Sequence, residues 1–200
     1  MSKIFIISAP SGCGKTTLVK ELCNSYSFLE QAISHTTRSK RANECEGNDY
    51  LFINNNEFMV KVRNKEFIEY QNVYNNLYGT SFSSIKSITD SGKDAILEID
   101  YKGMLSIKKS IPSAISIYIL PPNIQELRTR LKSRAMDSDE VIENRVSQAA
   151  KELPYSKFSD YIIINDRYED AAKSLKTIIL QTKLQCNSDI AALNTFFESC

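Results

Sequence analysis

The chain has 200 residues, of which 42% are hydrophobic, enough for one core of ordinary domain size or a core with small appended lobes. Its 25 Lys and Arg residues against 24 Asp and Glu residues give a formal net charge of +1, which excludes a broadly cationic nucleic-acid binder and a polybasic membrane-surface protein. No apolar run approaches the ~18 residues of a membrane-spanning helix. With no secretory signal recognised at the N-terminus, we expect a cytoplasmic protein without membrane or nucleic-acid partners.

Four short runs rich in Ile, Val, Phe and Tyr predict strands, over residues 3–8, 95–100, 114–120 and 161–165. They are apolar almost throughout, which is typical of parallel strands covered on both faces. Apolar residues at helical spacing predict helices over residues 16–26, 124–134, 138–151 and 168–184. Because strands and helices alternate, we expect a three-layer α/β domain with a mostly parallel sheet.

Residues 34–90 break this alternation. They are polar, contain several aromatic residues and short alternating segments, and predict a small mixed α/β lobe inserted into the core. Such insertions often form one wall of an enzyme site. The alternative is a surface excursion with no role in binding substrate.

The segment Ser8–Thr17 lies directly between the first predicted strand and the first predicted helix. Its glycines allow close approach of backbone N–H groups to a polyphosphate, Lys15 reaches the β- and γ-phosphate oxygens, and the Thr16 hydroxyl is a ligand for Mg²⁺. This is the pattern of a phosphate-binding P-loop, with Ala9 where the first glycine is usual. The predicted ATP-binding residues of this segment are Ala9, Pro10, Ser11, Gly12, Cys13, Gly14, Lys15, Thr16 and Thr17.

Two carboxylates end the second predicted strand. Glu98 and Asp100 share one face of it, at the carboxyl end where open α/β sheets bind ligands. Acidic residues at a strand end are often solvated turn formers. Beside a P-loop we predict an active-site role for both, because a metal-dependent phosphoryl transfer needs a carboxylate near the metal.

In this order and spacing the chain resembles the guanylate kinases, specifically those of bacterial type, over about residues 3–183. The similarity is carried by residues 8–17, 34–41, 44–50, 66–70, 77–80, 96–100 and 121–145. The resemblance implies a P-loop kinase core with an acceptor lobe and a helical lid, and phosphorylation of GMP, and also dGMP, by ATP with Mg²⁺. The implied domains are a core of residues 1–33 and 91–184 with its lid at about 123–150, a GMP-binding lobe of residues 34–90 and a tail of residues 185–200.

The resemblance also implies a set of GMP-binding residues. These are Ser34, Arg38, Arg41, Glu44, Tyr50, Glu69, Tyr78, Thr80, Glu98 and Asp100. Two arginines and two tyrosines of this set would hold the GMP phosphate, which suits the planar donor fork of Arg and the neutral hydroxyl of Tyr. Guanine would be recognised by Glu69, Thr80 and Glu98, since a carboxylate accepts from the adjacent N1–H and N2–H₂ donors of guanine and repels adenine.

The implied catalytic residues are Lys15, Arg38, Arg130, Arg134 and Arg145. The last three belong to the implied lid and its hinge, although a solvated basic helix face is the usual meaning of such a run. Asn165 resembles the adenine-pocket segment, and Thr16 with Asp100 would hold the metal. No general base is needed, because the GMP phosphate is already anionic at pH 7, so His35 is expected to be structural and partly buried.

Two other functions remain open at this stage. One is a non-catalytic, guanylate-kinase-like module that binds phosphopeptides, and the other is a P-loop kinase for a different small phosphate acceptor. The tail has apolar residues at helical spacing: Ile190, Leu193, Phe196 and Phe197. This pattern allows either a docking helix or a self-association surface, and the second would form a homo-oligomer.

Overall fold

The computed structural model describes residues 2–73, 75–133 and 138–184. Its core is a five-stranded parallel sheet in the order β2-β7-β1-β8-β9. The strands are β1 (Ile4–Ser8), β2 (Leu29–Gln31), β7 (Asp94–Ile99), β8 (Ile115–Leu120) and β9 (Tyr161–Ile164). The mixed α/β class with a mostly parallel sheet is therefore confirmed.

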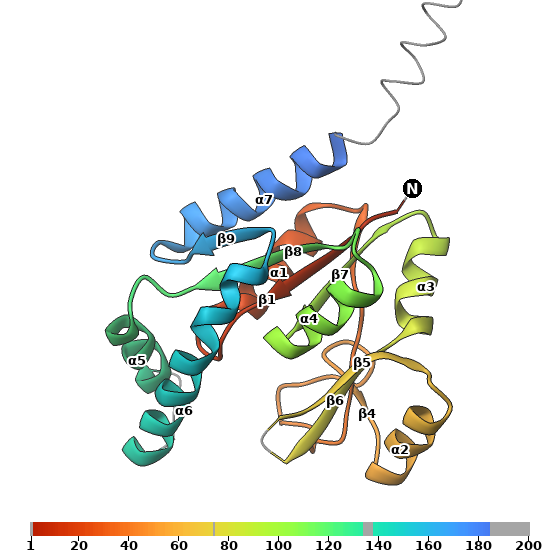
Figure 1. Cartoon of the computed structure of the whole chain (residues 1–200), viewed down its shortest axis with the longest axis horizontal. Coiled ribbons are helices and arrows are strands. Elements are labelled where there is room, and N and C mark those ends of the chain that lie inside the picture. The colour runs from red at the N-terminus through yellow and green to blue at the C-terminus, as the bar shows by residue number, and fades with distance from the viewer. Residues whose placement is uncertain (1, 74, 134–137, 185–200) are drawn as a thin grey trace, which may run out of the picture.

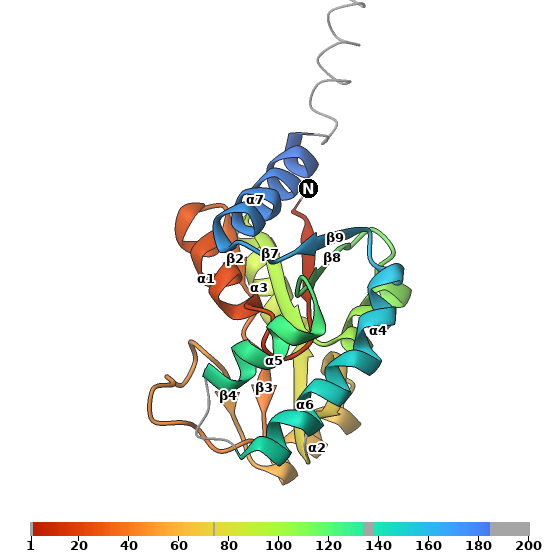
Figure 2. The ribbon, with the colours of Figure 1, turned by 90° about the vertical axis from the view of Figure 1, so that its left-hand side faces the viewer.

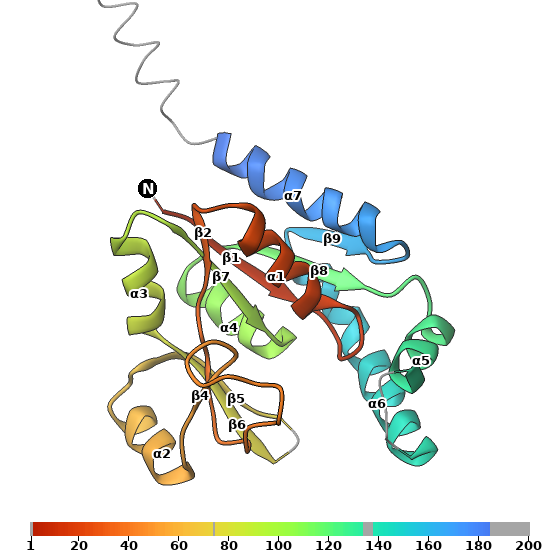
Figure 3. The ribbon, with the colours of Figure 1, turned by 180° about the vertical axis from the view of Figure 1, so that it is seen from behind.

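Both faces of the sheet are covered by helices, as the uniformly apolar strands predict. On one face, Phe5 and Ile7 of β1 pack into a core with α1 (Lys15–Ser25) and α7 (Tyr168–Leu184). On the other face, Ile6 packs with α3 (Phe82–Asp90) and α4 (Tyr101–Ser110). Figure 3 shows α1 and α7 in front of the sheet with α4 behind it. The three layers are thus helices, sheet and helices.

Each predicted strand and helix is observed within one residue of its predicted ends, apart from residue 134, which lies outside the described part of the chain. The sequence did not predict β2, α4 or the 3-10 helix η1 (Leu153–Phe158). β2 has only three residues, too few to show a pattern. Gly103 interrupts the pattern of α4, whose N-terminus is instead set by Asp100, the side chain of which accepts from the Gly103 N–H at 2.8 Å.

The inserted segment forms a second, four-stranded sheet in the order β4-β3-β6-β5. Its strands are β3 (His35–Thr36), β4 (Leu51–Phe52), β5 (Phe67–Val73) and β6 (Asn76–Ser81), and α2 (Asn55–Arg63) covers it. Phe58 stacks on Phe67 with ring centroids 4.5 Å apart to form the small core of this lobe. His35, expected to be partly buried, is only 6% exposed and lies against the edge of Phe67.

The small lobe and a helical hairpin extend from the same side of the core, beyond the carboxyl ends of the central strands (Figures 1 and 2). The hairpin consists of α5 (Ile124–Ser133) and α6 (Asp139–Glu152), which the Arg128–Glu143 ion pair joins at 2.7 Å. An ion pair of 2.7 Å between Lys20 of α1 and Asp49 links the core to the lobe. Within the described residues, no helix is long and apolar enough to cross a membrane.

Candidate functional site

The loop between β1 and α1 has the backbone that a P-loop requires. Gly12 and Gly14 adopt φ values of 93° and 84°, in the left-handed region that favours glycine. A Cβ on Gly12 would lie 2.9 Å from Leu131, and a Cβ on Gly14 would lie 2.7 Å from the Asn165 side chain. Alanine at either position would therefore be strained and would collide with a neighbour.

This loop is also tied to the far edge of the sheet. Asn165, which follows β9 and is only 5% exposed, donates from Nδ2 to the Cys13 carbonyl at 2.8 Å. Ala9 and Cys13 are buried in the core cluster beneath the loop. The predicted Asn165 thus fixes the P-loop, and α1 then begins at Lys15, where its first turn presents N–H groups without partners in the helix.

Lys15 bends back to the neighbouring strand. Its Nζ donates to the Ile99 carbonyl at the end of β7, at 2.8 Å. The charge of Lys15 also acts on the buried carboxyl group of Glu69 and the half-buried one of Glu152. Burial raises the pKa of each to about 7, and Lys15 acts in the opposite direction on both. The Lys15 ammonium therefore lies at the end of β7, close enough to these two carboxyl groups to influence their pKa values.

Glu98 lies against the P-loop helix. One carboxylate oxygen accepts a hydrogen bond from the Thr16 hydroxyl, and the other accepts from Nε2 of Gln31 on β2 at 3.3 Å. No local pattern singles out Gln31, because its partner is 67 positions away. The structure brings Thr16 and Glu98 together, and within the described residues no hydrogen bond joins Glu98 to Glu69 or Thr80, the other predicted guanine-binding residues.

Asp100 points in a different direction from Glu98. Its carboxylate caps α4, and its charge contributes to the raised pKa of Glu69, after burial as the main cause. Gly103, one turn further along, approaches Glu69 so closely that a Cβ there would lie 2.9 Å from its Oε2. Asp100 therefore lies on the Glu69 side of the site, and the prediction that it also holds the metal stays a prediction.

Glu69 is a buried carboxylate with two donors already in place. It is 7% exposed, and its Oε1 accepts from the N–H and the hydroxyl of Thr80 at 3.0 and 2.8 Å. Because the Thr80 proton is used in this way, Ser34, 3.0 Å from the same hydroxyl oxygen, must be the donor of their shared hydrogen bond. Three predicted GMP-binding residues are thus joined in one chain of hydrogen bonds.

Arg38 lies at the centre of a second cluster. It donates to the Tyr78 hydroxyl at 3.2 Å and to a carboxylate oxygen of Glu44 at 2.7 Å, and its guanidinium lies 5.5 Å from the centre of the Tyr50 ring. The Glu44 carboxylate also accepts from the Arg41 N–H at 2.9 Å, while the Arg41 side chain is exposed. Burial raises the pKa of Tyr50 to about 12, so its hydroxyl remains a donor at neutral pH.

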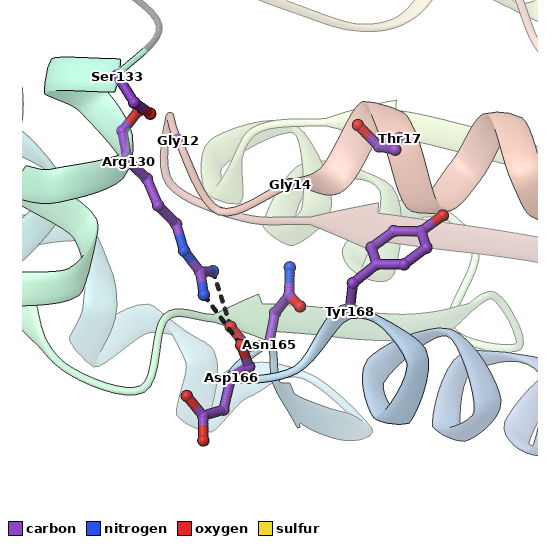
Figure 4. A pocket seen from close by; sticks show the side chains of 8 residues that line it. All are labelled: Gly12, Gly14, Thr17, Arg130, Ser133, Asn165, Asp166 and Tyr168. Atoms are coloured by element: carbon purple, nitrogen blue, oxygen red, sulfur yellow. Dashed lines mark hydrogen bonds between the residues drawn. The ribbon is translucent and has the colours of Figure 1, made fainter.

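A pocket of about 260 Å³ opens beside the P-loop. Figure 4 shows the side chains that line it, which come from the P-loop and α1, α5, and the segment after β9: Gly12, Gly14, Thr17, Arg130, Ser133, Asn165, Asp166 and Tyr168. Arg130 crosses its wall and donates to the backbone carbonyls of Asn165 at 2.7 Å and Asp166 at 3.1 Å. The sequence did not predict Ser133, Asp166 or Tyr168, although Asp166 directly follows Asn165 and Tyr168 lies three positions after it.

The other two predicted lid arginines are Arg134 and Arg145. Arg145 is half-buried on α6, and Arg134 lies outside the described residues. The predicted residues thus gather at two places: the P-loop with Thr16, Glu98 and the pocket, and the small lobe with the Glu69 and Arg38 clusters. Asp100 and Lys15 lie between them.

Comparison with known proteins identifies this arrangement. The family model described as guanylate kinase matches residues 1–182. The chain belongs to the guanylate kinase family. It is 43% identical to a guanylate kinase of Hydrogenovibrio crunogenus, over 92% of this chain and 89% of that protein, and 44% identical to one of Geobacter metallireducens, over 88% and 87%.

The structure agrees with the sequence comparison. The crystal structure of guanylate kinase from Anaplasma phagocytophilum matches with a TM-score of 0.77 and 29% identity, over 92% of this chain and 88% of that chain. Membership of the family confirms an enzyme, a P-loop kinase, and nothing in these comparisons favours the phosphopeptide-binding module or a kinase with another acceptor.

Proposed function

We propose that the chain transfers the γ-phosphoryl group of ATP to the phosphate of GMP, or of dGMP, with Mg²⁺ as the cofactor. The observation that carries this proposal is the buried carboxylate of Glu69. It sits in a lobe that also presents the Arg38, Tyr50 and Tyr78 cluster, so one face of the lobe offers an acceptor for a base and donors for a phosphate.

Guanine recognition depends on which carboxylate oxygen of Glu69 is still available to accept hydrogen bonds. Thr80 occupies Oε1, and Oε2 lies on the side of Gly103. Guanine brings two adjacent N–H donors to such a carboxylate, whereas adenine brings a bare nitrogen acceptor at the corresponding position. A buried carboxylate left facing an acceptor loses hydrogen bonds and gains repulsion, and sites of this kind discriminate by as much as ~10⁴.

The phosphate of GMP would meet the Arg38 cluster. A guanidinium offers a planar fork of donors, and the hydroxyls of Tyr50 and Tyr78 add neutral ones. Glu44 already accepts from Arg38, with side chains of both residues 16% exposed. We infer that Glu44 keeps the guanidinium oriented, and that the exposed Arg41 adds a second positive charge.

On the donor side, the P-loop and the pocket of about 260 Å³ would receive ATP. The loop N–H groups and Lys15 would hold the phosphates, and the pocket wall of Asn165, Asp166 and Tyr168 would face the nucleoside. Arg130 lies on that wall, and we propose that it acts with Arg134 and Arg145 to spread charge on the transferring group, as arginines do in phosphoryl-transfer enzymes generally.

The residues present fit a magnesium ion. Mg²⁺ prefers oxygen ligands, one or two of them carboxylates, and usually retains several waters. The hydroxyl of Thr16 and the carboxylate of Glu98 are in contact at the carboxyl end of β7, beside the phosphate loop. When bound, the ion would neutralise charge on the nucleotide phosphates. The contact favours Glu98 as the carboxylate on this side, in addition to the predicted Thr16 and Asp100.

The phosphoryl transfer itself needs positioning and charge stabilisation from the protein. The second pKa of a phosphate monoester is near ~6, so the acceptor is already nucleophilic at neutral pH and no proton has to be removed from it. The chain supplies orientation through Glu69 and Arg38 and positive charge through Lys15 and the lid arginines.

A coupled assay that measures ADP production with GMP, dGMP, AMP, UMP and ribose bisphosphate as acceptors tests this proposal. We expect turnover with GMP and dGMP and at least ~10³-fold lower kcat/KM with AMP. Preference for another acceptor would refute the guanine assignment, and no turnover with any of them would refute the catalytic one. A Glu69→Gln variant should lose the preference for GMP over AMP.

A further inference from the structure

This inference rests on the proposed Mg²⁺-dependent function and concerns a residue that lies outside the predicted site. We propose that Gln31 is a positioning residue for the metal ligand Glu98, which it holds turned toward Thr16 through a hydrogen bond from its amide. The three side chains come from β2, β7 and the first turn of α1, and only the fold brings them together.

The register of the sheet explains why Gln31 can reach Glu98. β2 pairs in parallel with β7, and Gln31 lies opposite Ile96. Because side chains alternate along a strand, Glu98 projects from the same face as Ile96, which belongs to the core cluster packed under α1. Gln31 and Glu98 are therefore neighbours on the face of the sheet from which the P-loop helix rises.

Each oxygen of the Glu98 carboxylate has its own donor. Oε1 accepts from the Thr16 hydroxyl, and Oε2 accepts from the Gln31 amide at 3.3 Å. A glutamate side chain has several rotatable bonds, so a single contact leaves it free to swing away from the helix. The hydrogen bond from the Gln31 amide to Oε2 keeps Oε1 of Glu98 beside the Thr16 hydroxyl, with which it would share the metal ion.

The chemistry of Gln31 suits this role better than that of a charged residue. A lysine at this position would compete with a cation for Glu98, whereas an amide donates without carrying charge. The hydrogen bond of Lys20 to Asp49 at 2.7 Å is the main cause of its raised pKa, to which the charge of Glu98 adds less. Within the described part of the chain, the side chains that donate to Glu98 are the neutral groups of Thr16 and Gln31, which leave its negative charge available to a metal ion.

The Gln31 side chain is not required to hold β2 in the sheet. The backbone does that, through hydrogen bonds from the Ala32 N–H to the Ile96 carbonyl and from the Asp94 N–H to the Phe28 carbonyl, each at 2.8 Å. A change confined to the amide should therefore leave the fold intact. This separates a role in metal binding from a role in stability.

The test measures binding of Mn²⁺, a spectroscopic substitute for Mg²⁺, by electron paramagnetic resonance in the presence of a non-hydrolysable ATP analogue. For Gln31→Leu, which keeps the size and removes the donor, we expect Mn²⁺ affinity to fall three- to tenfold, as for a partly exposed hydrogen bond to a charged group. GMP affinity and melting temperature should stay unchanged. In Gln31→Glu, a carboxylate opposite Glu98 should cause a larger loss.

Glu30→Gln is the matched control. Glu30 is the preceding residue of β2 and forms an exposed ion pair with Lys93 at 2.6 Å, so removing its charge should leave Mn²⁺ binding unchanged. In a double-mutant cycle, Gln31→Leu should cause no further loss in a Glu98→Gln background.

Two results would overturn the inference: wild-type Mn²⁺ affinity in both Gln31 variants, or losses from Gln31→Leu and Glu98→Gln that simply add. Failure of the proposed function would appear elsewhere, as a wild-type enzyme that does not phosphorylate GMP. Mn²⁺ binding to the wild type with the ATP analogue is measured without any acceptor, so the two failures are distinguishable.

Discussion

Replacing Glu69 by Gln should stabilise the protein above neutral pH while it weakens binding of GMP. Burial, with a further contribution from Asp100, raises the pKa of this carboxyl group from 4.5 to about 7. A folded-state pKa above the unfolded one means that the folded protein binds more protons between these values. Stability is therefore lost as pH rises from about 4.5 through about 7.

The size of this loss follows from the same two pKa values. One pKa unit corresponds to ~1.4 kcal/mol, so a charged Glu69 lowers the free energy of unfolding at pH 8 by ~3 kcal/mol. Gln presents a carbonyl oxygen that keeps both hydrogen bonds from Thr80 and carries no charge. At ~2–4 °C per kcal/mol, the variant should melt up to about 10 °C higher at pH 8. At pH 5 the difference should fall below ~1 kcal/mol.

GMP binding should show the opposite trend with pH. With a pKa of about 7, Glu69 is ~10% ionised at pH 6 and ~90% ionised at pH 8, so the wild-type affinity for GMP should rise about tenfold over this range. The phosphate of GMP also ionises near ~6, which adds about a factor of two in both proteins. Glu69→Gln should retain only that smaller dependence.

Thermal melting and calorimetric titration with GMP, each at pH 5, 6, 7 and 8, test both halves. Glu66→Gln is the control within the same lobe, because Lys61 holds the pKa of Glu66 below its ordinary value through a hydrogen bond, so this exposed change should give no stabilisation. Equal melting temperatures for wild type and Glu69→Gln at pH 8, or parallel pH profiles for GMP binding, would refute the argument.

Three further changes test other parts of the site. Lys15→Ala should lower kcat by ~10³-fold or more in the coupled assay while calorimetry still detects GMP binding, and retained turnover would contradict the P-loop assignment. Gly103→Ala places a Cβ 2.9 Å from Glu69 Oε2 and should raise KM for GMP more than KM for ATP, so equal effects would argue against this contact. For His35, burial and then the charge of Lys61 lower the pKa, so stability should fall as pH drops below 6.5, and urea unfolding at pH 7 and 5 should show a smaller fall in His35→Leu.

The sequence predicted the core of this fold well because the core depends on local patterns. Strands buried on both faces are uniformly apolar, and β1 and β8 were located for this reason within one residue. The helices α5, α6 and α7 carry apolar stripes that a helical period explains. Where the pattern is short, as in β2, or broken, as at Gly103 in α4, the local signal fails and only packing defines the element.

The part of the site that could be predicted is the part whose functional residues lie close together in the sequence. The P-loop has its glycines, lysine and threonine within ten residues, and the structure gives Gly12 and Gly14 the backbone that the pattern predicts. The partner of Thr16 is 82 positions away, and nothing local in the sequence indicates that Glu98 faces Thr16 while Asp100 faces Glu69. The strand end beside the P-loop predicted that both acidic residues belong to the site. Their directions differ because Glu98 is still part of β7, whereas Asp100 follows the strand and caps α4.

The functional cations differ in the charge of the groups that they contact. Lys15 is bonded to the carbonyl of Ile99, which is a neutral partner. Arg130 donates to the carbonyls of Asn165 and Asp166 and also forms an ion pair with Glu126 at 2.8 Å. A phosphate oxygen carries a full charge and forms stronger hydrogen bonds than a carbonyl, so ATP can draw Lys15 to itself at small cost.

Arg38 differs from Lys15, because its partner Glu44 is itself an anion, and the ion pair lies where both side chains are mostly buried. Displacing Glu44 would leave a carboxylate without its cation, which is expensive in such a setting. The GMP phosphate should therefore bind beside Glu44 and share the guanidinium with it. Because Arg38 is shared, the remaining attraction for the phosphate must come from the tyrosine hydroxyls and the exposed Arg41. The preference of the lobe for an anionic ligand therefore depends on these groups.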